Sequence, residues 1–205
     1  MNHVTIYTIG HSTHTLERFL ELVAEHRIEA LADVRSSPFS GRLPHFNRDH
    51  LCASALARNV EYVYLGEQLG GRARDEAAYD GDGRVNYSRV ANTPDFREGI
   101  SRLLKGAAMM RVALVCAEKD PIECHRGLLI GRHLKQRGVN VEHILPGGGL
   151  EPHREAEQRL QSRFGFDSAD LFRTEDELLE EAYRRQEVRV AYVRRGTPLQ
   201  KTVHQ

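Results

Sequence analysis

The segment Cys116–Arg126 holds the densest group of residues that could do chemistry. Its candidate catalytic groups are Cys116, Glu118 and Cys124, and its candidate substrate-binding groups are His125 and Arg126. Cys124 stands where a helix is expected to begin, and the N-terminus of a helix lowers thiol pKa values and attracts anions. The adjacent cationic side chains act in the same direction. We therefore expect a thiolate, an anionic substrate, or both at this point, with Pro121 stiffening the approach.

The spacing of the cysteines from neighbouring residues tests two known kinds of cysteine site. A phosphatase or rhodanese-type loop requires an arginine six positions after the nucleophilic cysteine, but those positions hold Ile122 and Ile130. A zinc site built from the two cysteines, His125 and His11 remains an alternative. The seven residues between the cysteines do not match common zinc-ligand spacings, so the primary interpretation assigns no metal ligands.

Polar residues also follow each of the other predicted strands. In open parallel sheets, ligands bind beyond the carboxyl ends of the strands. Asp33 is therefore a candidate for acid–base work, and an ion pair with Arg35 or Arg126 is its structural alternative. The further candidates for substrate binding are His11, Ser12, Arg35, Glu67 and His153.

Apolar runs alternate with stretches of helical periodicity over the first two-thirds of the chain. The expected strands are Val4–Ile9, Ala30–Val34, Glu61–Leu65, Arg111–Val115 (the central one) and Val139–Leu145. Strands alternating with helices predict an α/β fold with a mostly parallel five-stranded sheet flanked by helices. Expected helix starts include Thr13 or Thr15, Asn47, Thr93-Pro94 and Cys124, with the last helix ending at Gly138.

Residues 151–205 change to a helical pattern. We expect a helical extension packed on a core of residues 1–150, the two forming a single domain. Its helices are predicted over His153–Arg163 and from Thr174, where Glu177 completes a capping box. The tail Val188–Val193 is a candidate edge strand, and Gly70–Asn92 is expected to be a long mobile loop that could close over a phosphate.

Composition excludes several classes of protein. Lys plus Arg and Asp plus Glu both number 29, so no overall field draws the chain to nucleic acid or to an acidic membrane. No apolar run is long enough to span a bilayer, and the N-terminal residues lack a signal peptide pattern. Three cysteines are too few for a secreted disulfide framework. We expect a cytoplasmic protein without a membrane partner.

Several motifs together resemble the domain-of-unknown-function family 488. They are YTIGHS, DVRSSP, EYVYLGEQLGG and ALVCAEKDPIECHRGLLIGRHL, followed by the glycine-rich stretch before His153 and by AYRRQEVRVAY. The resemblance implies an α/β fold and an enzyme or a nucleotide-binding protein. The reaction of that family is unassigned, so the resemblance carries little chemistry over to these residues.

The primary functional hypothesis is an enzyme, a hydrolase or transferase, that acts on a phosphate-bearing substrate such as a nucleotide or a modified nucleic acid. Two alternatives remain open. One is a non-catalytic module that binds a nucleotide or a partner, and the other is a Cys/His metal-dependent hydrolase. No cofactor is predicted.

Overall fold

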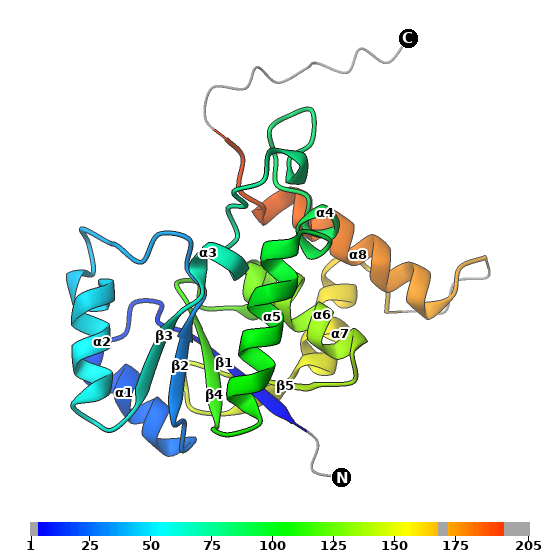
Figure 1. Ribbon diagram of the computed structural model, residues 1–205. Coiled ribbons are helices and arrows are strands. Elements are labelled where there is room, and N and C mark those ends of the chain that lie inside the picture. The colour runs from blue at the N-terminus through cyan, green and yellow to red at the C-terminus, as the bar shows by residue number, and fades with distance from the viewer. Residues whose placement is uncertain (1–3, 168–171, 195–205) are drawn as a thin grey trace.

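The computed structural model describes residues 4–167 and 172–194 and contains one six-stranded sheet (Figure 1). The strands are β1 (Thr5–Gly10), β2 (Ala30–Asp33), β3 (Glu61–Tyr64), β4 (Val112–Cys116), β5 (Asn140–Ile144) and β6 (Leu150–Pro152). Their order is β3-β2-β4-β1-β5-β6; β1 to β5 run parallel, and β6 pairs antiparallel with β5. The α/β fold and the parallel strands are confirmed, and the short β6 is an addition to the five predicted strands.

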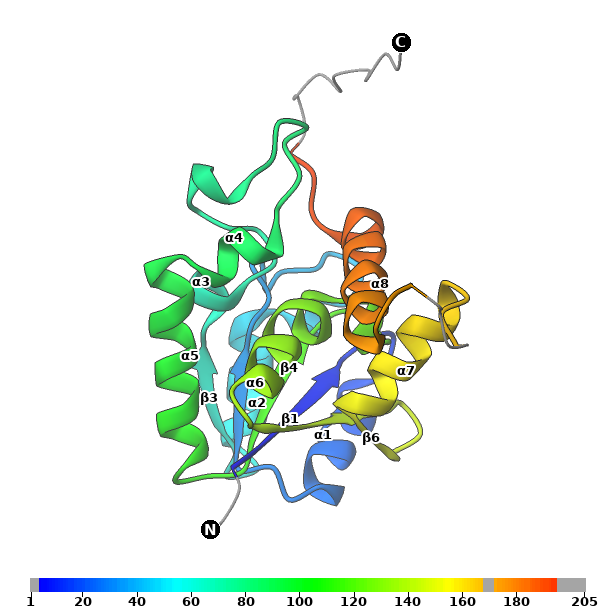
Figure 2. The same cartoon turned by 90° about the vertical axis from the view of Figure 1, so that its right-hand side faces the viewer.

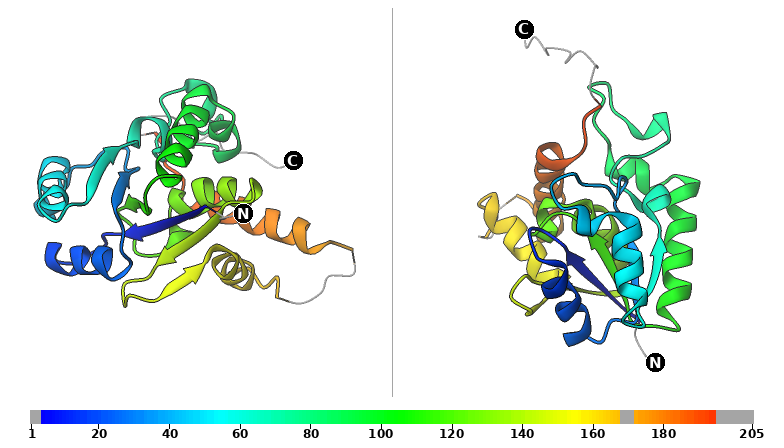
Figure 3. Two further views of the ribbon diagram at one scale, coloured as in Figure 1. Left: turned by 60° about the horizontal axis from the view of Figure 1, so that its bottom comes forward. Right: turned by 90° about the vertical axis from the view of Figure 1, so that its left-hand side faces the viewer.

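Helices cover both faces of this sheet. They are α1 (Leu16–Glu25), α2 (Arg48–Leu56), α3 (Gly66–Leu69), α4 (Tyr87–Ala91), α5 (Pro94–Ala107), α6 (Arg132–Gln136), α7 (His153–Arg163) and α8 (Glu175–Val190). Shorter turns are 3₁₀ helices at Pro44–Phe46, Glu76–Ala78 and Pro121–Glu123, and a π-helix at Arg126–Gly131. Helices α1 and α2 pack in one apolar cluster, and α5, the π-helix and α6 pack in the other (Figure 3).

Local sequence explains where the main elements begin. The Thr15 hydroxyl accepts a hydrogen bond from the backbone N–H of Arg18 at the start of α1. Thr93 caps α5 in the same way, with Pro94 at the first helical position. Every residue of β4 is buried, and the strand lies between β2 and β1. The predictions of both caps and of the central strand are confirmed.

The helices after residue 150 lie side by side against the core (Figure 2). Helix α7 spans His153–Arg163 as predicted. Helix α8 opens with the predicted capping box between Thr174 and Glu177. Its side chain Tyr183 is buried in the same apolar cluster as Leu160 of α7. This cluster also contains the central strand, which joins the extension to the sheet.

Three local predictions are corrected. Residues Gly70–Asn92 form a packed segment rather than a mobile loop, because Ala78, Val85 and Tyr87 are buried and two short helices form there. The tail predicted as a strand over Val188–Val193 begins as the last turn of α8, and only Val193 forms an isolated bridge, to Arg84. The helix predicted to begin at Cys124 begins one to two residues later, because Cys124 is extended.

The chain connections open a crevice at the carboxyl ends of β2 and β4. The segment after β2 leads to α2 on one face of the sheet, whereas the segment after β4 leads to the π-helix on the other face. Neighbouring strands whose connections part in this way form the usual ligand crevice of open α/β sheets. Within the part of the chain that the structure describes, no helix is long and apolar enough to cross a membrane.

Candidate active site

The crevice contains a cleft of about 290 Å³. Its floor and walls carry Arg35, Ser36, Cys116, Glu118, Cys124 and His125, and its roof is formed by Arg72, Tyr87 and Tyr192. Of the sequence candidates, the structure therefore brings together Arg35, two residues after β2, and four residues from the end of β4 and the segment that follows it. This volume is close to the lower end of small-molecule pockets.

Arg35 is buried in the wall of the cleft and is held in place by Asp33. Arg35 Nε donates to Asp33 Oδ1 at 2.9 Å, and Nη2 donates to Oδ2 at 2.5 Å. The Tyr62 hydroxyl donates to the same Oδ2 at 2.6 Å, and Arg35 Nη1 donates to the carbonyl of Phe46 at 2.8 Å. The predicted structural alternative for Asp33, an ion pair with Arg35, is confirmed. Both carboxylate oxygens of Asp33 are occupied by these donors. Its place supports positioning of Arg35 rather than acid–base work.

Two thiols, a carboxylate and an imidazole meet on the floor. The Sγ atoms of Cys116 and Cys124 lie 3.1 Å apart, and Glu118 Oε2 lies 2.8 Å and 3.0 Å from them. His125 Nδ1 lies 3.7 Å from each sulfur. Its Nε2 lies 3.0 Å from the carbonyl oxygen of Val34. Among the described residues, Cys116, Cys124 and His125 form the one set whose ligand atoms could hold a metal ion together.

The environment separates the two thiols. Burial alone would raise the pKa of Cys124, but the hydrogen bond from Cys116 and the charges of His125 and Arg126 outweigh it and lower that pKa well below its usual value. Burial, followed by the hydrogen bond to Cys124, raises the pKa of Cys116 well above its usual value. The pair therefore favours a thiolate at Cys124 and a thiol at Cys116.

The neighbouring groups respond to that thiolate. Although much of Glu118 is exposed to solvent, its carboxylate faces the sulfurs; desolvation there and the charge of Cys124 raise its pKa. Burial lowers the pKa of His125, but the Cys124 thiolate outweighs this effect and raises it overall. The raised pKa favours the protonated carboxyl more than in a free glutamate, which suits an acid–base role.

Arg126 lies behind this floor. Its guanidinium donates from Nη1 to the carbonyl of Glu118 at 2.5 Å and from Nη2 to the carbonyl of Lys119 at 3.0 Å. Its backbone N–H donates to Cys124 Sγ at 3.4 Å. The prediction that Arg126 contacts an anionic substrate is not supported by this geometry. Its side chain is 1% exposed, contacts backbone oxygens and does not line the cleft. It fixes the turn that carries Glu118.

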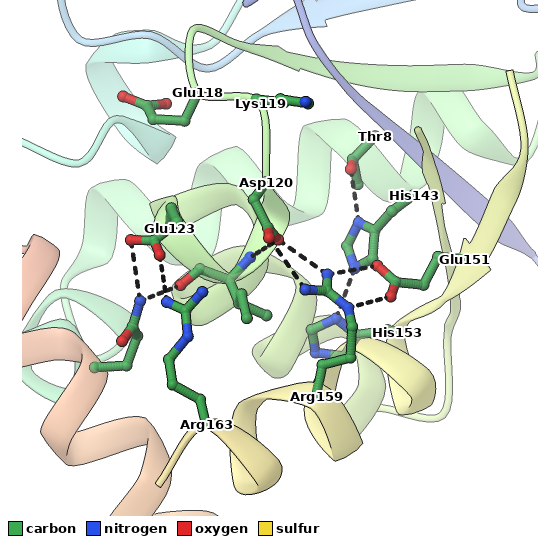
Figure 4. Close-up of polar contacts among 12 residues, drawn as sticks. Thr8, Glu118, Lys119, Asp120, Glu123, His143, Glu151, His153, Arg159 and Arg163 are labelled. Atoms are coloured by element: carbon green, nitrogen blue, oxygen red, sulfur yellow. Dashed lines mark hydrogen bonds and ion pairs between the residues drawn. The ribbon is translucent and has the colours of Figure 1, made fainter. Parts of the chain in front are cut away.

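The same turn is braced by the C-terminal helices (Figure 4). Asp120 accepts two hydrogen bonds from Arg159 of α7, at 2.9 and 3.0 Å, and one from the backbone N–H of Ile122. Arg163 pairs with Glu123. The loop between the cysteines is therefore anchored by α7 at Asp120 and at Glu123, which also lines the cleft.

Besides Arg126, four of the predicted substrate-binding residues do not line the cleft. His11 stacks on Phe46 at 4.3 Å, and Ser12 follows it with a left-handed backbone, φ 48°. Glu67 is exposed and pairs with Arg74 at 2.8 Å. His153 is buried in another network. Their polar groups follow the predicted strands in sequence, but the turns point their side chains elsewhere.

The network of His153 joins the sheet to the C-terminal helices (Figure 4). Thr8 Oγ1 lies 2.7 Å from His143 Nδ1, and His143 Nε2 lies 2.9 Å from His153 Nδ1. His153 Nε2 lies 3.1 Å from the Tyr183 hydroxyl, which donates to Glu157 at 2.9 Å. This chain of contacts is buried and lies apart from the cleft, which supports a structural role for His153.

Sequence reasoning missed the aromatic roof. Tyr87 is buried beside the thiols, and Tyr192 stacks under the guanidinium of Arg72 at 4.6 Å from the ring centre. Both tyrosines reach the cleft through contacts between distant segments, so no local spacing could indicate them. Ser36 could have been predicted from the sequence, because it stands in the DVRSSP motif. In the structure, its Oγ accepts a hydrogen bond from the backbone N–H of Arg72.

Comparison with known families places the chain. No curated protein matches the chain. The family described as Domain of unknown function DUF488 matches residues 15–132, more than half of the chain. The matched range includes Arg35 and the whole segment from Cys116 to Arg126, so the cleft floor lies within it. The chain belongs to the DUF488 family.

Proposed function

We propose that the protein is an enzyme that acts on a phosphate-bearing substrate bound in the cleft. The observation that carries this proposal is the shared location of a buried arginine and a coupled Cys–Glu–Cys–His group. A binding protein needs the arginine, but it has no evident need for a carboxyl and a thiol whose pKa values are shifted against each other. Perturbed titratable groups within a cleft are typical of catalytic sites.

Arg35 supports the choice of an anionic substrate. Its guanidinium donates to Asp33 and Phe46 and also lines the cleft, where it can contact a ligand. The guanidinium is held rigidly by the carboxylate behind it, and a rigid fork suits phosphate oxygens. Arg72 and Ser36 add further polar groups to the lining of the cleft.

Glu118 is the group that we assign to proton transfer. Its carboxylate lies against the floor while the residue stays open to solvent, so it can exchange protons with water between turnovers. Acid–base groups with a pKa moved towards neutrality contribute about 10²- to 10⁴-fold to rate. The size of the cleft suits one small phosphate ester or the exposed end of a larger molecule.

The test is a screen of nucleotides, phosphomonoesters and phosphodiesters for turnover and for thermal stabilisation of the full chain. Glu118→Gln should lower kcat at least about 100-fold and leave the Kd of the ligand within about threefold. Arg35→Gln should instead weaken binding by about tenfold or more, because a charge-assisted hydrogen bond is lost. Glu21→Gln, on the exposed face of α1, is the matched control.

A ligand that stabilises the protein without any turnover, in wild type and in Glu118→Gln alike, would contradict the proposal. That result would favour the non-catalytic binding module.

A further inference from the structure

We propose that Cys116, Cys124 and His125 bind one divalent transition-metal ion of the zinc class, with Glu118 beside a water molecule in the fourth coordination position. The inference deepens the proposed function, because it says how the cleft floor activates water. It rests on that function only for the role of the water, whereas the ion site stands on the geometry of the donor atoms.

The three donor atoms are already close to the spacing that one ion requires. Zinc binds thiolate sulfur at about 2.3 Å and imidazole nitrogen at about 2.0 Å. A tetrahedral ion therefore separates sulfur from nitrogen by about 3.6 Å and sulfur from sulfur by about 3.8 Å. In the structure, His125 Nδ1 lies 3.7 Å from each sulfur, and the two sulfurs lie 3.1 Å apart. Only the sulfurs need to move apart, by about 0.7 Å, which a small side-chain rotation allows.

His125 presents the correct nitrogen. Its Nε2 lies 3.0 Å from the carbonyl oxygen of Val34, and a carbonyl can only accept, so Nε2 carries the hydrogen. In the neutral imidazole, Nδ1 then has the free lone pair, and it faces the sulfurs. Metal-binding histidines are commonly oriented by such a carbonyl contact on the other nitrogen.

The sulfur ligands are also supported from outside. The backbone N–H of Arg126 donates to Cys124 Sγ at 3.4 Å, which stabilises a thiolate. Cys116 ends the fully buried strand β4, and the guanidinium of Arg126 clamps the turn that follows it. Both sulfurs are therefore carried by backbone that is fixed before an ion arrives.

The chemistry of the donors selects the ion. Two thiolates and an imidazole suit Zn²⁺ and its neighbours, whereas Mg²⁺ and Ca²⁺ take oxygen ligands. Three protein ligands leave a fourth position, and this is the arrangement of catalytic zinc rather than structural zinc. Glu118 Oε2 lies within 3.0 Å of both sulfurs, so a small outward rotation places it beside a water at that position.

The protons released on ion binding and moved during hydrolysis can be followed atom by atom. The ion binds through lone pairs of the two sulfurs and of His125 Nδ1, and the proton of the Cys116 thiol passes to solvent. In hydrolysis of a phosphate ester, the oxygen of the water would form a bond to phosphorus while the bond from phosphorus to the leaving oxygen breaks. Glu118 would take one proton from that water and pass it to the leaving oxygen. No oxidant or reductant is consumed.

The direct test is titration of the reduced, metal-free full chain with Co²⁺ and then with Zn²⁺. Co²⁺ should bind in a 1:1 ratio and give a thiolate-to-cobalt charge-transfer band with tetrahedral visible bands, and Zn²⁺ should displace it. Cys116→Ser and Cys124→Ser should each weaken binding at least about 100-fold. Cys52→Ser is the matched control, because Cys52 lies on α2 away from the cleft, and it should bind as wild type does.

A second measurement avoids variants that fail to fold. In wild type, Zn²⁺ should protect Cys116 and Cys124 from alkylation while Cys52 keeps its rate. Absence of the charge-transfer band, unchanged binding by both serine variants, or alkylation of Cys124 at saturating Zn²⁺ would each overturn the ion site. None of these readouts needs a substrate, so a failed ion site is distinguished from a failed phosphate-bearing substrate.

Discussion

The pair Asp33–Arg35 offers the clearest quantitative test of how the cleft wall is held. The two side chains are 0% and 6% exposed, and they share two hydrogen bonds. Asp33→Asn keeps the shape of the side chain but removes its charge and places an N–H₂ group against the donors of Arg35 or Tyr62. The tyrosine hydroxyl can rotate and accept, but the guanidinium cannot. The buried guanidinium of Arg35 then lacks a negative charge to balance its own.

Breaking a buried ion pair by removing one partner costs about 3–5 kcal/mol. We expect the lower end, about 3 kcal/mol, because Arg35 borders the cleft and water can reach it there. With a urea m-value of about 2 kcal/mol/M, the unfolding midpoint should fall by about 1.5 M. Adding Arg35→Met should recover part of the loss, because it removes the unpaired charge.

The control is Glu21→Gln, which breaks the exposed pair with Arg18, where the two side chains are 57% and 35% exposed. Exposed pairs contribute at most about 1 kcal/mol, so its midpoint should move by about 0.5 M or less. If Asp33→Asn shifts the midpoint no more than this control does, the reasoning about the buried charge is refuted. A double variant less stable than Asp33→Asn would refute it as well.

Two further perturbations test the surroundings of the cleft. An added Cβ at Gly10 would lie 1.9 Å from the carbonyl oxygen of Glu118, so Gly10→Ala should lower Tm by about 6 °C or more, whereas Gly41→Ala, with nothing within 4 Å, should not. Burial lowers the pKa values of His11 and His153 from 6.5 to about 4, so protons bind the unfolded chain first and stability falls as the pH drops from about 6.5 to 4. At pH 5.5 each histidine should cost about 1.4 kcal/mol relative to neutral pH, and a urea midpoint unchanged between pH 7 and 5.5 would contradict this.

The fold was accessible from the sequence where the signals are local. The fully apolar run before Cys116 marks the central strand, and hydroxyl caps such as Thr93 and Thr174 mark helix starts. These signals depend on residues three or four positions apart, so the rest of the chain barely alters them. The same holds for the cleft floor, where one short turn after β4 carries most of the reactive groups.

The missed features depend on contacts across the chain. The segment before α4 was expected to be mobile because it is polar and rich in glycine. The backbone N–H of Val85 donates to the carbonyl of Tyr192, and that of Tyr87 donates to the Glu187 carboxylate. Each of these partners lies about 100 positions away in sequence. No pattern within the segment can reveal such pairing.

Arg126 shows a different limit of sequence reasoning. Its type and place after Cys124 favour an anion contact, and only the helix geometry decides otherwise. The π-helix begins at Arg126, and the guanidinium of Arg126 donates to the carbonyls of Glu118 and Lys119 in the turn that follows β4. The buried guanidinium needs acceptors, and it finds them in these backbone carbonyls rather than in a substrate.

By binding the carbonyls of Glu118 and Lys119, Arg126 helps to fix the distance between the two sulfurs. The two sulfurs come from segments that meet only through the turn of residues 117–123, so their separation depends on how rigidly that turn is held. Arg126 holds it from the core side, and Arg159 of α7 holds Asp120 from the outer side. From α8, Gln186 donates to the carbonyl of Ile122 at 2.7 Å. Catalytic groups need placement to within about 0.5 Å, which requires a supporting set of contacts. The C-terminal helices therefore support the candidate site, although their residues lie beyond the range that the family match covers.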